Sequence, residues 1–329
     1  MIRKLRIKNF KSIKDIGFDC KKLNVFIGEP NSGKSNIIEA LSLKSQNAVS
    51  DYLSKDIFRY KIVGDLFYDF NIYTPIEITT DYSTLTLEYA YINNTPENRF
   101  NLIPDSLLAT EMKSPIKVEH DGKISQFSTL PETSIRYYEY KRLKEFQNRF
   151  APHLSVPFGD NIPGLLLSQK LLKNWVSEFL ISKGLNLTLK PTENDITVSK
   201  IINQEILSYP YFAISETLQR VIFYSLAIMS NRESTLLFDE PESNTFPFYT
   251  KYLAERIALD ETNQFFITTH NPYLLLSLIE KSPMDQLNVC IVTMKDYETV
   301  VTPLKEEQIS RVLDLNSDVF FNFNQILEL

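Results

Sequence analysis

The segment GEPNSGKS at residues 28–35 constrains this chain more than any other part of its sequence. It matches the pattern GxxxxGK[ST] at every fixed position and lies between a short apolar run, Leu23–Ile27, and a stretch with helical spacing. The main-chain N–H groups of such a loop, together with a helix N-terminus, form a nest for phosphate oxygens. We expect Lys34 to reach the β- and γ-phosphates of a nucleotide and the Ser35 hydroxyl to ligand a metal ion. The predicted cofactors are ATP and Mg²⁺, and the predicted binding residues of this segment are Gly28, Glu29, Pro30, Asn31, Ser32, Gly33, Lys34, Ser35 and Asn36.

A second segment, LLFDEPE at residues 236–242, is an apolar strand that ends in acidic residues. In a chain with a phosphate-binding loop, this pattern predicts that Asp239 holds Mg²⁺ through water and that Glu240 orients or deprotonates the attacking water. The alternative is a buried strand followed by solvated carboxylates, which is common in proteins. The phosphate-binding loop earlier in the chain favours the catalytic interpretation.

Two further segments complete the set. FFITTHNP at residues 265–272 places His270 at the end of another buried strand, from which it could reach a γ-phosphate, so Glu240 and His270 are the predicted catalytic residues. ISETLQR at residues 214–220 opens a predicted helix of about 216–230, with Ser215 as its N-cap. Ser215 could face a phosphate of a second protomer, or it could be an ordinary N-cap of a core helix.

Composition narrows the function classes. The chain has 329 residues, 43% of them hydrophobic, and a net charge of −6, so a general affinity for nucleic acid is not expected. Cys20 and Cys290 lack CxxC spacing, and the three histidines do not cluster, which argues against a disulfide framework or a zinc site. The N-terminus has no apolar signal core and no apolar run is long enough to span a bilayer, so we expect a cytoplasmic protein without a membrane partner.

Two basic stretches could still contact DNA. One is the N-terminal segment, and the other is the aromatic-interleaved segment 136–150. Solvated faces of a strand or helix are the alternative for both stretches, and the acidic net charge favours it. Their cations are Arg3, Lys4, Arg6, Lys8, Lys11 and Lys14 in the first stretch, and Arg136, Lys141, Arg142, Lys144 and Arg149 in the second.

Patterning along the chain predicts one discontinuous domain, 1–329, in four parts. Residues 1–45 form an N-terminal half with two strands and the phosphate-binding loop, and 46–135 alternate as antiparallel hairpins of an inserted arm. Residues 136–212 form a helical lobe, with one helix of about 165–183 and two short strands. Residues 213–329 alternate helix and strand in an α/β pattern, which includes the segments that carry Ser215, Asp239 and His270.

The order of these motifs resembles that of non-transporter ABC ATPases related to RecF, SMC heads and the overcoming-lysogenisation-defect (OLD) nucleases. The resemblance is closest to stand-alone prokaryotic ATPases of the OLD branch. It implies an α/β P-loop fold of ABC type, with a central mixed or parallel sheet flanked by helices, an inserted antiparallel β arm and a helical lobe. It also implies that Lys11 belongs to the nucleotide-binding residues and that two copies close around ATP as a homodimer. The segments that carry it are NFKS at 9–12, GEPNSGKSN at 28–36, ISETLQR at 214–220, DEPESNTFP at 239–247 and THNPYLL at 269–275.

The chain departs from this family in four places. Both glycines of the LSGGQQR signature are replaced, and the segment after Glu240 lacks the usual Asp, so Ser243 and Asn244 would have to bridge the protomers. No glutamine can be assigned to the Q-loop, because Gln126 and Gln147 are both poorly placed. OLD nucleases carry a C-terminal Toprim domain, for which the residues before Leu329 leave no room, so we expect any nuclease to be a separate polypeptide.

The leading hypothesis is therefore a regulatory ATPase that hydrolyses ATP to ADP and phosphate, with turnover slowed by the altered signature. ATP-driven dimerisation would control a separately encoded effector, a nuclease or toxin, in prokaryotic antiviral defence; this rests on family analogy. The alternative is a RecF- or SMC-like ATPase of DNA repair or maintenance that contacts DNA through 136–150. A transporter nucleotide-binding domain or a nucleotide sensor that barely hydrolyses ATP accounts for the sequence less well.

Overall fold

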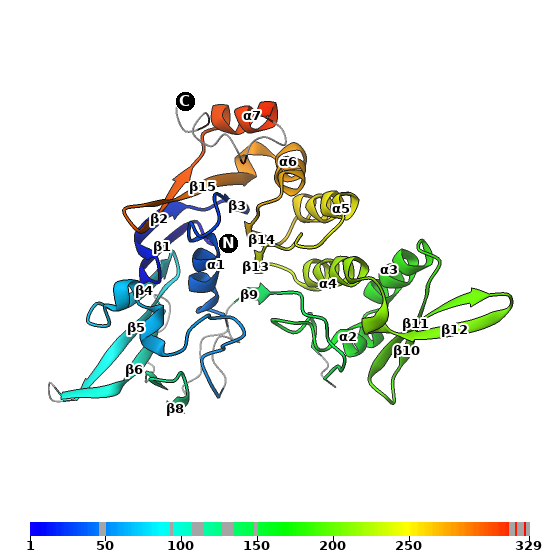
Figure 1. The fold of residues 1–329 in the computed structure, drawn as a ribbon, viewed down its shortest axis with the longest axis horizontal. Helices are drawn as coiled ribbons and strands as arrows, with labels where there is room; N and C mark the ends of the chain where they lie inside the picture. Colours follow the sequence, from blue (N-terminus) through cyan, green and yellow to red (C-terminus); the bar gives the residue numbers. More distant parts are fainter. Residues whose placement is uncertain are drawn as a thin grey trace.

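A six-stranded sheet forms the centre of the molecule (Figure 1). The computed structural model describes residues 1–45, 51–92, 95–106, 115–126, 134–147 and 151–315, together with residues 320 and 326. The strand order is β16-β15-β3-β14-β13-β9; β16 alone is antiparallel to its neighbour, so the predicted central mixed sheet is confirmed. The bounds are β3 (Leu23–Ile27), β9 (Ile135–Tyr138), β13 (Thr235–Asp239), β14 (Gln264–Thr268), β15 (Leu287–Lys295) and β16 (Glu298–Pro303).

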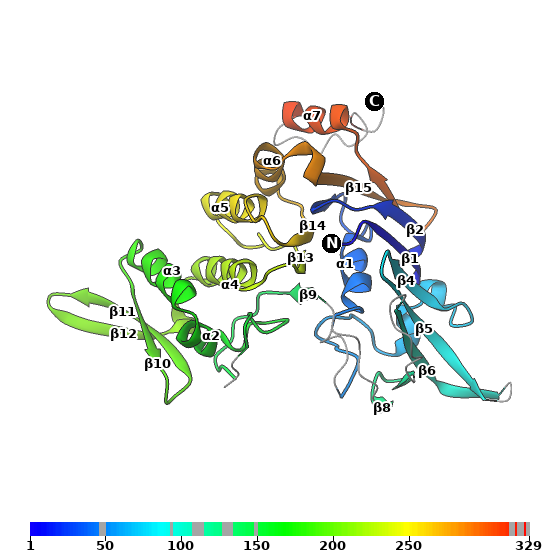
Figure 2. The same ribbon diagram turned by 180° about the vertical axis from the view of Figure 1, so that it is seen from behind.

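The central strands are apolar on both faces because helices cover both faces. In β3, Val25 packs into one hydrophobic core while its neighbour Phe26 packs into the other. The first core contains α4 (Glu216–Ser230), α5 (Pro247–Ala258) and α6 (Pro272–Lys281), and the second contains α1 (Lys34–Ser42). Figures 1 and 2 show α1 on the opposite side of this sheet from α4 and α5.

A seven-stranded antiparallel sheet lies beyond α1, in the order β2-β1-β4-β5-β6-β7-β8. Strands from the predicted inserted arm extend the sheet begun by β1 and β2 and do not form a sheet of their own, because β1 pairs with β2 on one edge and with β4 on the other. Residues 46–50, 93, 94, 107–114 and 127–133 of the predicted arm lie outside the described residues. The bounds are β1 (Lys4–Phe10), β2 (Ile13–Asp19), β4 (Ile76–Thr80), β5 (Ser83–Ile92), β6 (Thr95–Ser106), β7 (Ile116–Glu119) and β8 (Ile124–Gln126).

The helical lobe differs from the prediction in two respects. The single helix predicted for 165–183 is two helices, α2 (Ile162–Ser168) and α3 (Lys170–Ile181), because Gln169 between them has extended backbone angles. A three-stranded sheet follows, of β10 (Asn186–Lys190), β11 (Asp195–Ile202) and the unpredicted β12 (Glu205–Pro210). Short 3-10 helices occur at η2 (Val63–Leu66), η3 (Tyr68–Phe70), η4 (Tyr211–Ala213) and η5 (Met284–Gln286), and α7 (Glu306–Leu315) was also not predicted.

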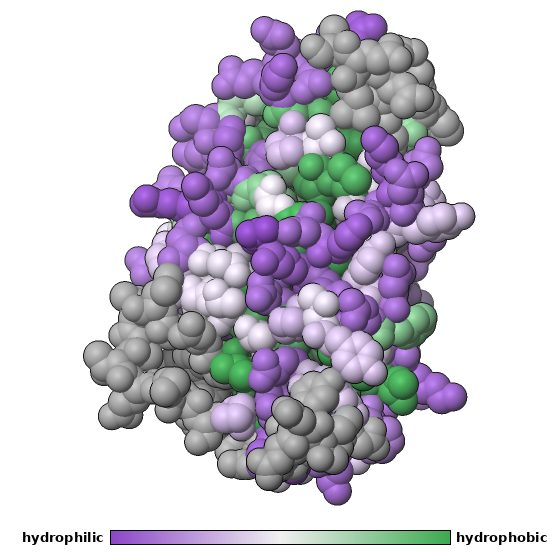
Figure 3. Space-filling view, turned by 90° about the vertical axis from the view of Figure 1, so that its left-hand side faces the viewer, coloured by the Kyte–Doolittle hydropathy of each residue, from purple (hydrophilic) through white to green (hydrophobic). Residues whose placement is uncertain are grey.

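The cysteines, the lengths of the helices and the polarity of the surface can also be read from the structure. Cys20 and Cys290 are free thiols. Among the helices of the described ranges, none combines the length with the hydropathy that crossing a bilayer would require. Figure 3 views the side of the molecule that carries the seven-stranded sheet, and the coloured surface there is mainly hydrophilic.

Candidate functional site

The phosphate-binding loop connects β3 to α1 and needs glycine at two positions. Gly28 has φ 153°, and a Cβ at that position would lie 2.0 Å from the carbonyl oxygen of Val292 in β15. Gly33 has φ 98°, and a Cβ there would lie 2.1 Å from the Thr299 hydroxyl oxygen in β16. Both glycines therefore permit conformations and close approaches that a side chain would prevent.

Lys34 is the buried cation of this loop. Its Nζ donates to the carbonyl oxygens of Gly28 at 3.0 Å and Glu29 at 2.7 Å, and to the Ser32 hydroxyl at 3.3 Å. Burial lowers the pKa of Lys34 to about 8, although the carboxylates of Glu240, Asp239 and Glu29 act in the opposite direction. The ammonium group is thus mostly charged at neutral pH and makes hydrogen bonds that phosphate oxygens could replace.

Ser35, in the first turn of α1, contacts Asp239 at the end of β13. The Ser35 hydroxyl donates to Asp239 Oδ1 at 3.1 Å, and the Thr268 hydroxyl donates to the same carboxylate oxygen. Asp239 and Thr268 are register partners in the parallel pair β13–β14, so the sheet fixes their separation. Because parallel strands present their carboxyl ends at one edge, side chains far apart in sequence are gathered there.

Glu240 and His270 face one another beside this group. The His270 Nε2 atom lies 3.2 Å from Glu240 Oε1, and the Ser243 hydroxyl donates to Glu240 Oε2 at 3.2 Å. The Glu240 backbone has φ 45°, and its N–H donates to the hydroxyl of Thr268 at 3.0 Å. Burial, followed by the nearby Lys34, lowers the pKa of His270 below its ordinary value, so the imidazole is neutral at neutral pH.

A cavity of about 260 Å³ joins these groups. The predicted residues among its lining are Pro30, Asn31, Gly33, Lys34, Ser35, Asn36, Glu240 and His270. One lining residue, Arg59, was not predicted, because it belongs to the connection between α1 and η2, which carries no motif. The Arg59 side chain is 70% exposed and pairs with Glu39 of α1 at 2.6 Å, so its guanidinium stands at the mouth of the cavity.

Lys11 and its neighbours contact α1 and the phosphate-binding loop from outside the cavity. The Lys11 ammonium pairs with the buried Glu39, and Lys11 is not among the residues that line the cavity. The adjacent Ser12 hydroxyl accepts from Asn36 Nδ2 at 2.8 Å and lies 2.7 Å from the Thr299 hydroxyl, which donates to the Ser32 carbonyl oxygen at 3.1 Å. The NFKS segment therefore contacts the loop from the turn between β1 and β2.

Ser215 occupies the predicted N-cap position of α4 but makes no side-chain capping hydrogen bond. Its side chain is exposed, and Ser215 is not among the residues that line the cavity of its own chain. Within the same segment, Gln219 is buried and donates to the Ile214 carbonyl oxygen at 2.8 Å. Of the residues predicted for the site, eight line this cavity, and Asp239 contacts the lining residue Ser35. Gly28, Glu29 and Ser32 belong to the loop but do not line the cavity, and neither do Lys11 and Ser215. Of the two glutamines weighed for the Q-loop, Gln147 does not line the cavity, and the Gln126 side chain lies outside the described residues.

The donor set suits a hard cation. Ser35 supplies a hydroxyl oxygen and Asp239 a carboxylate oxygen, which are ligand types that Mg²⁺ prefers. In the described ranges, no group of three or more His, Cys, Asp and Glu side chains is placed to hold a metal ion. Mg²⁺ at this position would therefore take its remaining oxygens from phosphates and water, which is its usual mode in nucleotide sites.

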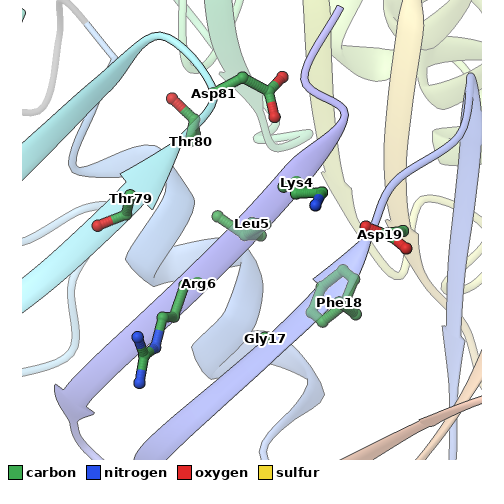
Figure 4. A pocket seen from close by; sticks show the side chains of 9 residues that line it. All are labelled: Lys4, Leu5, Arg6, Gly17, Phe18, Asp19, Thr79, Thr80 and Asp81. Atoms are coloured by element: carbon green, nitrogen blue, oxygen red, sulfur yellow. The ribbon is translucent and has the colours of Figure 1, made fainter. Parts of the chain in front are cut away.

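Cations of the N-terminal basic stretch are paired with carboxylates. Arg6 pairs with Asp15 at 2.7 Å and Lys14 with Glu298 at 2.7 Å; Lys8 and Lys11 are paired as well. A hollow of about 570 Å³ lies against β1, β2 and β4, and Figure 4 shows that both basic side chains (Lys4, Arg6) and acidic ones (Asp19, Asp81) line it. This mixture of charges favours the interpretation of the stretch as a solvated face.

Comparison with known proteins places this site in a family. A profile described as "AAA ATPase domain" matches residues 1–158, and one described as "AAA domain, putative AbiEii toxin, Type IV TA system" matches residues 92–277. The chain belongs to the second of these families. It therefore contains an ATPase domain of ABC type, and nucleotide binding is a property of that domain.

The chain is also similar to individual proteins, with low sequence identity. An "ATP/GTP phosphatase" of Helicobacter pylori (strain ATCC 700392 / 26695) is 24% identical over 320 residues, which cover 82% of this chain and 85% of that protein. An SMC head bound to the C-terminal winged-helix domain of ScpA is 15% identical, with a TM-score of 0.55 over 93% of this chain and 99% of the other. A second SMC head, from Pyrococcus furiosus, is 15% identical, with a TM-score of 0.50 over 95% and 98%. These structures show the fold alone, and they confirm the predicted ABC-type architecture.

Proposed function

We propose that this protein hydrolyses ATP to ADP and phosphate with Mg²⁺, between two copies of the chain, and that the closed dimer controls a separately encoded effector. The observation that carries the enzymatic part is the convergence of Lys34, Ser35, Glu240 and His270 on one cavity at the carboxyl edge of the central sheet. Asp239 accepts a hydrogen bond from Ser35 beside this cavity. The phosphate-binding loop could bind any nucleoside triphosphate. The carboxylate and imidazole facing it provide the groups that hydrolysis requires.

The residues divide the chemistry among them. Lys34 exchanges its carbonyl partners for phosphate oxygens, and its positive charge balances the negative charge that develops in the transition state. Glu240 accepts a hydrogen bond from the attacking water and orients it, while His270 holds the Glu240 carboxylate from the other side. Mg²⁺, held by Ser35 and Asp239, would neutralise charge on the phosphate oxygens when bound.

A second copy of the chain is proposed because no residue of α4 lines the cavity of its own chain. Ser215 starts a 15-residue helix, is exposed and lies away from the cavity of its own chain. In a two-fold dimer, the N-terminus of α4 could cover the phosphates of the partner, where the partial positive charge of a helix N-terminus favours anions.

The biological role is proposed from relatives. The family description names a toxin of a type IV TA system, which supports a place for this chain in a two-protein system of the defence type. The DNA-maintenance alternative has less support, because four cations of the N-terminal stretch pair with carboxylates and two cations of 136–147, Lys141 and Arg142, do so as well.

Substitution of Glu240 tests the enzymatic proposal. Glu240→Gln removes the charge that orients water but keeps the shape of the side chain, so ATP binding should persist while phosphate release slows by about 100-fold or more. Calorimetric titration and a phosphate-release assay measure the two quantities on the same protein. Wild-type turnover in Glu240→Gln, together with normal ATP affinity, would assign the water-orienting role to another residue.

A further inference from the structure

A second hollow, of about 700 Å³, lies at the opposite end of the central sheet strands from the ATP site. It is lined by residues of β9, of the segment before α2, of the α2–α3 junction and the start of α3, of the C-terminal end of α4 and of the turn after it. Figures 1 and 2 show where these elements lie in the fold. We call this second hollow the α4–β9 hollow. Its volume lies within the range of about 300–1,000 Å³ that is typical of small-molecule sites.

Three basic side chains from three separate segments line the α4–β9 hollow. They are Arg136 of β9, His153 of the segment before α2, and Arg232 of the turn after α4. No Asp or Glu is among its lining residues. In the described part of the chain, neither arginine has a carboxylate oxygen within the 4.0 Å of an ion pair.

This lack of carboxylate partners distinguishes Arg136 and Arg232 from five other arginines of the described ranges. The chain carries 41 acidic against 35 basic residues, and these five are Arg6, Arg59, Arg142, Arg220 and Arg311. Arg3 and Arg256 also form no ion pair with a described carboxylate, but neither lines the α4–β9 hollow; Arg256 donates to the Tyr252 hydroxyl instead. Like charges gathered in one concave site repel each other unless an anion neutralises them. The hollow of Figure 4 differs, because Asp19 and Asp81 are among its lining residues. Of the two hollows, the α4–β9 hollow is therefore the one suited to an anion.

A hydrogen bond also fixes the orientation of the Arg136 guanidinium group in β9. Arg136 donates from one guanidinium nitrogen to the Ser234 hydroxyl, which in turn donates to the Arg232 carbonyl oxygen at 2.9 Å. The remaining N–H groups of the Arg136 guanidinium form no ion pair with a carboxylate of the described residues and are oriented before any ligand arrives. A planar guanidinium held in this way is suited to bidentate contact with a phosphate group.

We propose that the α4–β9 hollow is a binding site for a small phosphate-bearing molecule, which Arg136 and Arg232 hold through its phosphate oxygens. Leu172 and Met229 line the same hollow and offer an apolar surface to the organic part of such a ligand. His153 supplies a further nitrogen at the phosphate end; burial and the charge of Arg136 keep its pKa below the ordinary value. The ligand would bridge β9 to the end of α4, beside the start of β13, which carries Asp239 at its other end.

Calorimetric titration with inorganic pyrophosphate tests this site. The protein carries Lys34→Ala throughout, so that the ATP site contributes little to phosphate binding. We expect saturable binding of one pyrophosphate per chain, weakened at least tenfold by Arg136→Gln and again by Arg232→Gln. Arg311→Gln is the matched control, because Arg311 is an ion-paired arginine of α7 outside the hollow, and it should leave the affinity unchanged.

The outcomes separate the possibilities. Arg232 is exposed, so Arg232→Gln is expected to fold even if Arg136→Gln does not, and thermal melting identifies a folding defect. Pyrophosphate binding that survives both substitutions, or no saturable binding at all, overturns the proposal. Citrate is the carboxylate counterpart: weaker binding of citrate than of pyrophosphate supports a phosphate site, and equal or tighter binding overturns the assignment of ligand class.

Discussion

Lys34 shows how a single buried cation connects the free protein with its nucleotide-bound form. Its three hydrogen bonds to the loop satisfy the ammonium group without a ligand, and burial places its pKa near 8. A phosphate ligand would bring more negative charge than the carbonyl oxygens it replaces, so the exchange favours binding. The same residue thus stabilises the empty loop and selects for phosphate.

Lys34→Ala should therefore reduce ATP affinity at least 100-fold, because hydrogen bonds to charged groups contribute about 1.5–3 kcal/mol each and the substitution removes more than one. The pH dependence follows from the cited pKa. Wild-type affinity should fall as pH rises through about 8, where the free protein loses the Lys34 proton. Calorimetric titration at pH 7 and pH 9 measures both effects. Unchanged affinity in Lys34→Ala would mean that the loop is not the phosphate site.

Glu242 is a buried carboxyl group behind the proposed catalytic pair. It is 5% exposed, its Oε1 accepts from the Thr269 hydroxyl, and its Oε2 has no hydrogen-bond partner among the described residues. Burial raises the pKa of Glu242 from 4.5 to about 7. The folded protein therefore holds a proton that the unfolded chain releases at lower pH, and stability from this group is lost as pH rises from about 4.5 to about 7.

Glu242→Gln should flatten this part of the pH dependence, because the amide stays neutral at every pH. Between pH 5 and pH 8 the variant should lose less stability than the wild-type protein, or gain some relative to it. Urea unfolding at the two pH values measures the difference, and Glu255→Gln, a change at an exposed ion pair with Lys281, is the control. Equal pH dependence in Glu242→Gln and wild-type protein would show that the buried carboxyl group does not titrate in this range.

At the scale of elements, the phosphate-binding loop depends on strands that are distant in sequence. Gly28 lies against the backbone of β15, and Gly33 lies against Thr299 of β16, which also contacts Ser12. The C-terminal strands β15 and β16 therefore shape a loop that begins at residue 28. Backbone contacts of this kind cannot relax by changing a rotamer, so a substitution at Gly28 has to displace a strand.

Gly28→Ala should destabilise the fold by roughly 3 kcal/mol or more, because it adds a steric clash to an unfavourable backbone conformation. Gly184→Ala provides the matched control: Gly184 also has a positive φ, of 73°, but a Cβ there would contact nothing within 4 Å. Gly184→Ala should therefore lower the stability only by the cost of a positive φ for alanine, about 1–2 kcal/mol. Chemical denaturation of both variants gives the comparison, and equal costs would contradict the clash with Val292.

Elements with strong local signals were predicted to within a residue or two. The helix Glu216–Ser230 has the predicted bounds, because its apolar periodicity delimits it. The strand β12 and the helix α7 were missed: β12 is exposed along its whole length, and α7 lies beyond the last predicted strand. The pairing of β4 with β1 could not be derived either, because its register partners are as far apart in sequence as Leu5 and Thr80.

The residues of the site can likewise be divided into those that the sequence predicted and those that it did not. The residues of the cavity that lie in motifs were predicted, because chemistry and spacing coincide in the sequence. Arg59 and its partner Glu39 were not, because only the folded path of the connection after α1 brings a guanidinium to the cavity. The ion pair of Glu39 with Lys11 is likewise a long-range contact, and it holds the Lys11 side chain against α1.

At the scale of the whole molecule, the cavity is built from the carboxyl ends of β3, β13 and β14, with Arg59 at its mouth. The first turn of α4 does not take part in it, although Ser215 and its exposed side chain stand at a helix N-terminus that could bind an anion. Two copies related by a two-fold axis would complete both cavities at once, since the same surfaces meet reciprocally. ATP favours such a dimer only through contacts that the open form lacks.

Ser215→Arg places a bulky side chain at this proposed seam and should abolish ATP hydrolysis, while the folding of each chain and its nucleotide binding stay intact. Lys34→Ala should also be inactive, because it disables the phosphate site of its own chain. A mixture of the two proteins would form dimers in which one cavity combines an intact Lys34 with an intact Ser215 from the partner. With random exchange, half of the dimers are mixed and each has one complete cavity, so the mixture should recover about a quarter of wild-type phosphate release. Full activity of Ser215→Arg alone, or no recovery in a mixture that sedimentation shows to be dimeric, would mean that each chain completes its own site.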